Sequence, residues 1–373
     1  PSGYLQSSYV ADYNGTSYAM NGQESGSLQS GFRKYLTGNS TLKWETVTQT
    51  NYGIDFGFFN QSLVGTIDYF YKKTTDMLYL PPYIGAFGEG GDTYVNGPSM
   101  ENRGVEILLT YRNSLPSGFN YSITGNIATF KNKITELPDN VRSVYGGNGM
   151  LDDIIGRPRN SIYGYVAQEE VDNSPQQAGK GLGRIRYKDL DGDGRITQDY
   201  DRTWIGVSDP DFTYGLNLQA SYKNVDLALF FQGVHGGDVW DSWIEYSDFW
   251  NIQNVNNTNH LKGVFNAWSP QNPDSNIPAL STRNTNDEKR TSTYFLKDGS
   301  YLKLRTIELG YTFPESMVKK AMISRLRAYV SANNVFTIKK WWDSNRFSGP
   351  DPEIRDFGYV IPFTATVGVN ITF

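Results

Sequence analysis

Residues 363–373 have the sequence FTATVGVNITF, and their pattern is the clearest indication of the fold. Apolar residues occupy every second position, and threonine, glycine or asparagine stand between them. Successive side chains of a β-strand point to opposite faces, so this alternation predicts a strand with one apolar and one polar face. We expect Val367 and Val369 on the apolar face and Thr366 and Gly368 on the other.

The same alternation recurs upstream and predicts a series of antiparallel strands. Turn-forming residues such as glycine, asparagine and serine separate the strands. The face opposite each apolar set carries mainly small, polar or charged residues. The apolar sets are Ile54, Phe56 and Phe58; Ile67, Tyr69 and Tyr71; Val105, Ile107, Leu109 and Tyr111; Phe119, Tyr121, Ile123 and Ile127; Tyr214, Leu216, Leu218 and Ala220; Val225, Leu227, Leu229 and Phe231; and Leu326, Ala328 and Val330.

One predicted strand keeps its alternation only if it contains an irregularity. Leu302 and Leu304 are in step with each other, whereas Ile307 and Leu309 are in the opposite step. A β-bulge inserts one extra residue into a strand and would restore a common face. We therefore predict a bulge at Arg305–Thr306.

The connections between the predicted strands alternate between short and long. The short ones are 60–62, 114–118, 223–224 and 314–324, and the long ones are 76–100, 132–209, 235–299 and 337–361. Transmembrane β-barrels have short periplasmic turns, long extracellular loops and aromatic residues near the strand ends. The alternative is a soluble β-sandwich, whose strands also alternate but whose loops do not sort by length to one end. The pattern favours the membrane barrel.

The composition agrees with a barrel and argues against other classes. The 373 residues contain no cysteine, which leaves no disulfide framework and no thiolate metal site. A net charge of −5 argues against nucleic-acid binding. The chain has no apolar run long enough for a transmembrane helix, and its first residues do not resemble a signal peptide. For an exported protein, we therefore expect a processed or partial sequence.

A series of short motifs adds a family resemblance. They are LKWE (42–45), TQTNYGIDFGF (48–58), DYFYKKTTDML (68–78), NRGVE (102–106), YKDLDGDG (187–194), IG (205–206), PDFTYG (210–215), FFQG (230–233), DGSYLKLR (298–305), LGY (309–311) and NNVFT (333–337). Their order and spacing resemble those of SusC/RagA-type TonB-dependent transporters. The resemblance covers residues 42–373.

This resemblance implies an all-β fold, an antiparallel transmembrane barrel of about 22 strands. Residues 1–373 would form its C-terminal portion, without the N-terminal plug domain and the segment that contacts the TonB complex. The implied function is TonB-dependent import of oligosaccharides or peptides across the cell outer membrane. A SusD-like surface lipoprotein would dock on the long loops, and membrane lipid would surround the barrel.

The motif DLDGDGRIT, residues 189–197, predicts a structural calcium site in an extracellular loop. It matches the start of an EF-hand-type loop, with oxygen ligands at positions 1, 3 and 5, glycine at 6 and a backbone carbonyl at 7. Tyr200 stands where a bidentate glutamate normally closes such a site. The alternative is an Asp/Gly-rich turn without metal. The predicted ligands are the side chains of Asp189, Asp191 and Asp193, the carbonyl of Arg195, and a closing carboxylate from Asp199 or Asp201.

Aromatic residues cluster in two of the long connections. Flat rings among Asp and Asn residues suit sugar binding, but loop packing or contact with a partner protein also explains them, and we prefer this second interpretation. The candidate substrate or partner residues are Trp240, Trp243, Tyr246 and Trp250, with Trp341 and Trp342 in the second connection.

No catalytic pattern stands out. The chain has two histidines, no cysteine nucleophile and neither a Gly-x-Ser-x-Gly nor a His-Glu-x-x-His motif. We therefore predict a non-enzyme. The alternatives are a passive porin-like channel and an outer-membrane barrel enzyme of about ten strands.

Overall fold

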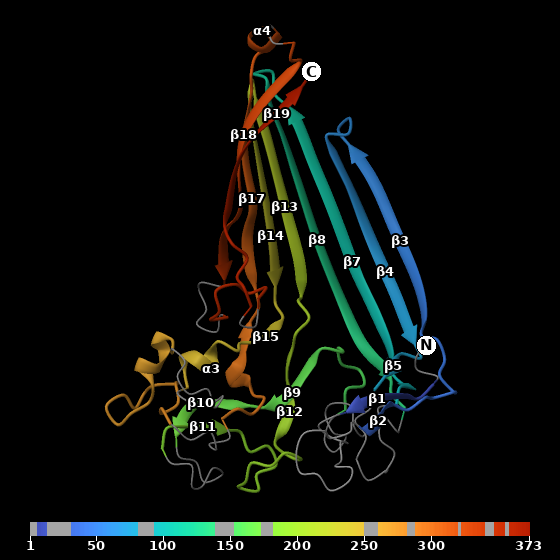
Figure 1. The fold of residues 1–373 in the computed structure, drawn as a ribbon, viewed down its shortest axis with the longest axis vertical. Coiled ribbons are helices and arrows are strands. Elements are labelled where there is room, and N and C mark those ends of the chain that lie inside the picture. Colours follow the sequence, from blue (N-terminus) through green and yellow to red (C-terminus); the bar gives the residue numbers. More distant parts are fainter. Residues whose placement is uncertain are drawn as a thin grey trace. The chain divides into compact units, whose positions relative to one another are not determined.

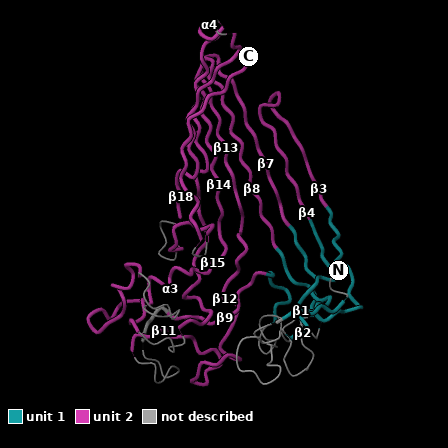
Figure 2. Tube along the Cα trace, viewed as in Figure 1, with its two compact units in different colours: residues 1–50, 71–103, 132–159 teal, residues 51–70, 104–131, 160–373 magenta. Residues whose placement is uncertain are grey.

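The computed structural model describes residues 6–12, 31–80, 93–138, 153–172, 182–249, 260–281, 288–319, 322–339, 347–354 and 358–373. Two compact units divide the chain (Figure 2). Unit 1 comprises 1–50, 71–103 and 132–159, and unit 2 comprises 51–70, 104–131 and 160–373. Within the described ranges no helix is both long and apolar enough to cross a membrane.

A nine-stranded sheet dominates the fold (Figure 1), and its neighbouring strands follow the order β19-β18-β17-β14-β13-β8-β7-β4-β3. The pairings of this sheet that lie in unit 2, from β8 to β19, are antiparallel. We call β13 to β19 of this sheet, which lie in unit 2, the wall. The nine strands are β3 (Thr46–Phe58), β4 (Leu63–Thr75), β7 (Ser99–Ser114), β8 (Phe119–Glu136), β13 (Phe212–Tyr222), β14 (Val225–His235), β17 (Tyr301–Thr312), β18 (Arg325–Lys339) and β19 (Thr364–Thr372).

The register of the wall places the predicted apolar sets on one face. Ala220, Leu227, Leu309, Val330 and Val367 pair in sequence across the strands and form one outward row. Val367 is 79% exposed, and Leu309 and Val330 are each just over half exposed. A sandwich would bury this face against a second sheet. Its exposure therefore confirms the barrel-type alternation, in which apolar side chains face lipid.

The predicted bulge is also confirmed. Phe230 pairs with Thr306 and Phe231 pairs with Leu304. Arg305, which lies between Leu304 and Thr306, therefore has no pairing partner in β14. The extra residue changes the phase of β17, and this brings Leu304 and Ile307 to the same face. The irregularity continues into β18, where Asn334 adopts a positive φ of 53°.

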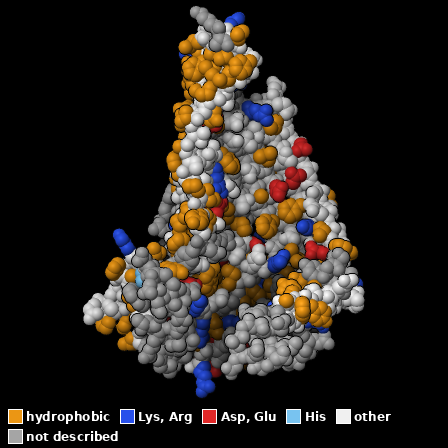
Figure 3. Space-filling view, viewed as in Figure 1, with side chains coloured by type: hydrophobic (Ala, Val, Ile, Leu, Met, Phe, Trp, Pro, Cys, Tyr) orange, Lys and Arg blue, Asp and Glu red, His pale blue; other side chains and the backbone are white. Residues whose placement is uncertain are grey.

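The short links lie at one end of the strands, and the described parts of the long connections in unit 2 lie at the other (Figure 1). The link between β13 and β14 is a tight turn in which Lys223 has a φ of 54°. The link between β17 and β18 contains the one-turn helix α4 (Glu315–Val318). Hydrophobic side chains gather over the α4 end of the strands (Figure 3).

Short elements lie before β3 and within the long connections. In unit 1, β1 (Ser8–Asp12) pairs with β2 (Gly31–Leu36) ahead of β3, and β5 (Leu78–Tyr79) pairs with β6 (Val95–Asn96). In unit 2, β9 pairs with β12, β10 with β11 and β15 with β16. These unit 2 elements are β9 (Ser161–Tyr165), β10 (Ala167–Asp172), β11 (Arg184–Tyr187), β12 (Arg202–Val207), β15 (Asp238–Trp240), α3 (Ile244–Ser247), η4 (Lys262–Asn266), η5 (Thr293–Phe295) and β16 (Leu296–Asp298).

We call the described residues of 160–207 and 238–298 the cap. Unlike the wall, the cap has a buried core of its own. That core consists of Tyr165, Ile185, Tyr187, Ile244, Phe249 and Phe295. Because these residues come from separate connections, their packing joins the connections into one folded structure.

Candidate functional site

The face of the wall opposite the apolar face is polar and would line the lumen of a barrel. One row across it pairs Asn217, Phe230, Thr306, Asn333 and Thr364. The hydroxyl of Thr306 donates to the side-chain oxygen of Asn333 over 3.1 Å. Phe230 is 39% exposed and places an aromatic ring among amides and hydroxyls. This combination suits contacts with a polar solute that also has apolar faces.

An open cavity of about 750 Å³ lies on this side near the short links. Its lining is mainly amide, hydroxyl and charged, and includes Gln61, Arg112, Asn120, Gln219 and Asp226. Such a surface favours water or a polar occupant over lipid. The cavity therefore agrees with a lumen-facing assignment.

An ionic cluster crosses three strands next to this cavity. Arg327 of β18 donates to both carboxylate oxygens of Asp226 in β14 and, over 2.7 Å, to Glu308 of β17. The guanidinium reaches Asp226 by passing over Gly310 of β17, where a Cβ atom would collide with it. Glycine at position 310 thus leaves room for the guanidinium, and the cluster links β14 with β18, which are not direct neighbours.

The segment 347–354, which we call the strap, is held against the polar face by ion pairs. Lys303 of β17 is 2% exposed and contacts Asp351 over 2.6 Å and Glu353 over 2.7 Å. Arg305, the bulge residue, also binds Glu353, and Tyr301 donates to the same carboxylate over 2.7 Å. Burial favours the neutral acid, but these hydrogen bonds outweigh it and lower the pKa of Glu353.

The strap also contacts the cap. Asp241, which is fully buried, accepts hydrogen bonds from the backbone and the hydroxyl of Ser348, each over 2.6 Å. Phe347 is 1% exposed. Gly349 lies so close to the rings of Phe347 and Trp243 that a side chain at 349 would collide with both. Ion pairs therefore hold the strap to β17, and hydrogen bonds and close packing hold it to the cap.

The candidate aromatic residues have different surroundings. Trp240 stacks on Phe295 with ring centroids 4.7 Å apart and packs against the cap core. Trp243 lies against the strap, and Tyr246 is half-buried beside it in α3. Trp240 and Trp243 thus support the loop-packing interpretation. Trp250, Trp341 and Trp342 lie outside the described residues.

Charged residues that sequence reasoning missed also hold the cap together. Arg184 and Glu288 form a buried ion pair at 3.0 Å, and Glu288 also accepts from the backbone of Ile185. The guanidinium of Arg290 lies 4.9 Å from the ring centroid of Tyr165 and 5.4 Å from that of Tyr187. The paired residues come from separate connections, so no local sequence signal marks them.

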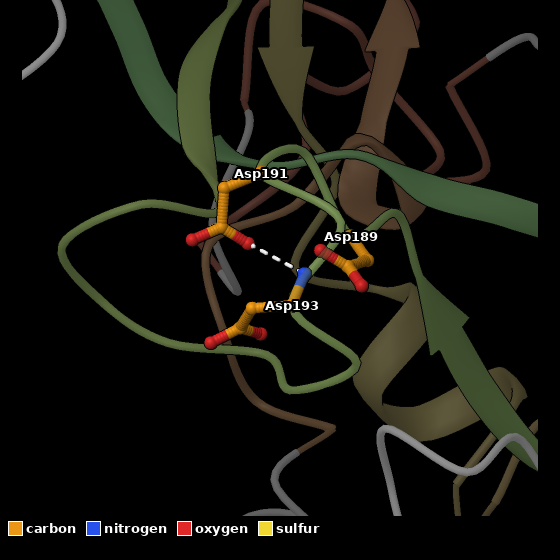
Figure 4. Close-up of side chains that lie close together, drawn as sticks. All are labelled: Asp189, Asp191 and Asp193. Atoms are coloured by element: carbon orange, nitrogen blue, oxygen red, sulfur yellow. Dashed lines mark hydrogen bonds between the residues drawn. The ribbon is translucent and has the colours of Figure 1, made fainter.

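The acidic loop, residues 189–201, brings three predicted ligands together (Figure 4). Asp189, Asp191 and Asp193 each offer a carboxylate oxygen within 4.8 Å of the others. The backbone folds around Asp189, whose oxygens accept the N–H groups of Gly192 over 2.7 Å and Gly194 over 2.9 Å. Both glycines have positive φ. A carboxylate has about four lone-pair sites, so these bonds leave lone pairs free for a cation.

The electrostatics of the acidic loop differ between its carboxylates. The N–H groups of Gly194 and Gly192 hold the pKa of Asp189 below its usual value. Partial desolvation and the charge of Asp193 raise the pKa of Asp191. The repulsion between these carboxylates is what a divalent cation would relieve.

The two candidates for the closing ligand have different surroundings. Asp201 is fully buried, and its oxygens accept from the backbone N–H groups of Leu190 over 2.8 Å and Thr197 over 2.6 Å. It therefore closes the loop through backbone hydrogen bonds. Asp199 and Arg195 are exposed. The donor set of three aspartates fits a hard cation such as Ca²⁺, with Asp201 bracing the loop.

The cap exposes several large apolar side chains on its outside. Phe265 in η4 is 86% exposed. Leu182, Leu261 and Leu280 are also exposed. A folded cap with such side chains has the features of a protein-docking surface.

Comparison with known proteins identifies the family. The family profile described as "TonB dependent receptor-like, beta-barrel" matches residues 5–335. TonB-dependent receptor P3 of Formosa agariphila is 31% identical over 368 residues, covering 90% of this chain and 35% of that protein. TonB-dependent receptor SusC of Bacteroides thetaiotaomicron is 27% identical over 352 residues, covering 90% and 32%.

A structural comparison agrees on the fold. The solved structure of the RagAB peptide transporter superposes with a TM-score of 0.75 at 23% identity, covering 99% of this chain and 38% of that one. The chain thus spans roughly a third of the length of its matched relatives. With its alternating strands, its exposed apolar face and this profile match, the chain belongs to the TonB-dependent receptor family and is part of a SusC/RagA-like β-barrel of the outer membrane.

Proposed function

We propose that this chain forms part of the wall and the extracellular cap of an importer that takes up oligosaccharides or peptides across the outer membrane, driven by TonB. The single observation that carries the proposal is the cap. Its connections form a folded structure with a buried aromatic core instead of independent loops. Loops of this length are usually functional or disordered, and the described residues of these loops are folded.

A SusD-like surface lipoprotein is the proposed partner. The exposed side chains of Phe265 and Leu261 offer apolar anchors, and charged residues such as Lys262 stand beside them. Anchors of this kind within a polar rim are typical of protein interfaces. The likeness to the protein named SusC and to the RagAB transporter supports a partner of the same class.

For the cargo, oligosaccharide is our first choice and peptide the second. The polar row on the wall offers hydroxyls, amides and the ring of Phe230. A sugar has both hydroxyls for hydrogen bonds and C–H faces that stack on aromatic rings, which matches this mixture. The carboxylates of the strap and the cations of β17 could serve a peptide, but Asp351 and Glu353 already pair with Lys303 and Arg305.

The test uses the full-length protein in its native cell. Affinity purification from membranes should recover a lipoprotein, and Phe265→Asp should weaken its binding about thirtyfold, because a buried aromatic anchor contributes about 2 kcal/mol. Met317→Asp is the matched control, since Met317 is an exposed apolar residue at the other end of the strands.

Growth then identifies the cargo. Deleting the gene should impair growth on one class of polysaccharide and spare growth on free monosaccharides. Impaired growth on peptides alone would select the second cargo. Normal growth on every complex nutrient, with no lipoprotein recovered, would contradict the importer proposal and favour a porin-like channel or a barrel enzyme.

We further propose that the acidic loop binds Ca²⁺ in a structural role. Asp189, Asp191 and Asp193 would supply side-chain ligands, the Arg195 carbonyl a backbone ligand, and Asp199 or Asp201 the closing oxygen. Replacing Asp191 and Asp193 by Ala should abolish the protection that Ca²⁺ gives the loop against proteolysis and leave the barrel folded. Equal protease sensitivity with Ca²⁺ and with chelator in the unmodified protein would contradict this proposal.

A further inference from the structure

The outward face of the sheet carries a depression centred on one alanine, where β8 meets β13 and β14 of the wall. Three rows of paired residues surround it: Phe119, Tyr222 and Val225; Tyr121, Ala220 and Leu227; and Ile123, Leu218 and Leu229. Ala220 is the central residue of this lattice and the smallest side chain in it. A groove of about 300 Å³ follows from the missing volume. It is lined by these residues except Tyr222 and Val225, together with Ser122 and Gln219.

The depth of the groove in the membrane follows from the aromatic residues around it. Phe119, Tyr121 and Tyr222 lie at the short-link end, and the ring centroids of Phe119 and Tyr121 are 5.9 Å apart. Tyr residues in a barrel's aromatic girdle sit at the level of the lipid headgroups. The groove therefore begins at that level and runs toward Leu218 and Leu229, into the hydrocarbon.

A cation stands at the headgroup end. Lys223, in the exposed turn after β13, is held with its ammonium 5.2 Å from the ring centroid of Tyr222. It follows Ala220 by three residues, which corresponds to about 10 Å along a strand. An anionic group above the girdle and an apolar chain below it would be separated by a similar length.

We propose that this groove binds one glycerophospholipid of the periplasmic leaflet, with the phosphate at Lys223 and an acyl chain over Ala220. Short barrel turns face the periplasm, which places the site in that leaflet. The apolar side chains disfavour a polar ligand, and the lysine selects a lipid that carries a phosphate over one that has no charged group. The inference rests on the membrane position of the wall and is independent of the proposed cargo and partner.

The experiment maps lipid contacts by photo-crosslinking. The full-length protein is reconstituted with a phosphatidylethanolamine that carries a diazirine on its acyl chain, and the crosslinked peptides are identified by mass spectrometry. Peptides containing residues 218–229 should be labelled more strongly than those containing 326–330, which also face lipid. Ala220→Phe should fill the groove and reduce labelling of 218–229 roughly tenfold, the effect of losing contact with about two methylene groups.

Two controls make the outcome decisive. Ala328→Phe enlarges an outward alanine three strands away, beside Tyr311 and Val369, and should not change labelling at 218–229. Lys223→Asn removes the cation, and asparagine tolerates the positive φ of this position. This variant should lose the preference for the phospholipid over a diazirine-bearing diacylglycerol. Should Ala220→Phe fail to fold, Ala220→Leu replaces it. Uniform labelling of all outward peptides in the unmodified protein, or unchanged labelling in the folded Ala220 variant, would overturn the proposal.

Discussion

In the wall, Leu309, Val330 and Val367 lie side by side, and each is more than half exposed. In the cap, Tyr187 and Phe295 are 1% exposed or less. Both regions belong to one unit and follow each other along the chain, yet they place their apolar side chains in opposite ways. The difference shows that each region is adapted to a different solvent.

The wall leaves its apolar face for lipid, so its stability depends on the bilayer and on the hydrogen bonds between strands. The cap lies outside the hydrocarbon and must bury its rings as a water-soluble domain does. Its core should therefore respond to truncation, whereas the outer face of the wall should respond mainly to charge. Four predictions test this contrast.

The largest effect is expected in the cap core. Phe295→Ala removes a fully buried ring that stacks on both Trp240 and Phe249. Such truncations cost about 3–5 kcal/mol. Hydrogen exchange should speed up throughout the cap, while the strands keep their protection and the barrel keeps its heat-modifiable migration on gels. Loss of protection in the strands as well would mean that cap and wall unfold together.

The ion pairs of the strap come next. Lys303→Met leaves Asp351 and Glu353 without their buried cation, and losing one partner of a buried pair costs about 3 kcal/mol or more. The expected result is faster proteolysis at residues 347–354. Lys319→Met is the control: its pair with Glu315 is exposed and spans one helical turn, so its loss should cost less than about 0.5 kcal/mol.

A pair of neighbours in β17 tests the two faces of the wall. Ile307→Arg places a charge on the lipid face and should cost about 2–4 kcal/mol near the bilayer centre. Thr306→Arg places the same charge on the polar face and should cost about 1 kcal/mol, for the hydrogen bond to Asn333. Unfolding in urea from lipid bilayers measures both. Equal costs would contradict the assignment of the faces.

Lowering the pH should change the local stability of the strap and of α3 in opposite directions. Both changes should be smaller than those caused by the substitutions above. The pKa of Glu353 is lowered, so its contribution is complete above its usual value near 4.5 and is lost as pH falls through the lowered pKa. Burial raises the pKa of Asp248, despite hydrogen bonds from Ser247 and Tyr294. Proton uptake by the folded state therefore stabilises the region around α3 as pH falls. Hydrogen exchange at pH 7 and pH 4, corrected for intrinsic rates, should show the strap loosening and α3 tightening.

The strands of the wall were predictable from sequence because the pattern that specifies them is local. Alternation with a period of two requires only neighbouring residues, and it correctly predicted even the bulge at Arg305. The close approach of the Asp189, Asp191 and Asp193 carboxylates was also predictable, because these residues are close together in the sequence. The core of the cap was not, because Tyr165, Phe249 and Phe295 lie far apart in sequence and belong to connections without periodicity.

The strap shows the same limit. Lys303 and Arg305 looked like ordinary polar positions of a strand, and nothing in residues 347–354 predicts that Asp351 and Glu353 fold back onto them. The aromatic loop was predicted with two interpretations. Packing accounts for Trp240 and Trp243, whose contacts with Phe295 and Gly349 depend on tertiary structure alone.

The bulge at Arg305 has a consequence for insertions and deletions. In a regular strand, gaining or losing one residue would exchange the lipid-facing and lumen-facing sets beyond that point, so length changes are poorly tolerated. Here β17 already carries one residue more than β14, and β18 accommodates the mismatch with the positive φ of Asn334. A change of one residue at this position would alter the bulge and leave both faces in register. We expect related chains that differ in the length of this strand to differ at Arg305.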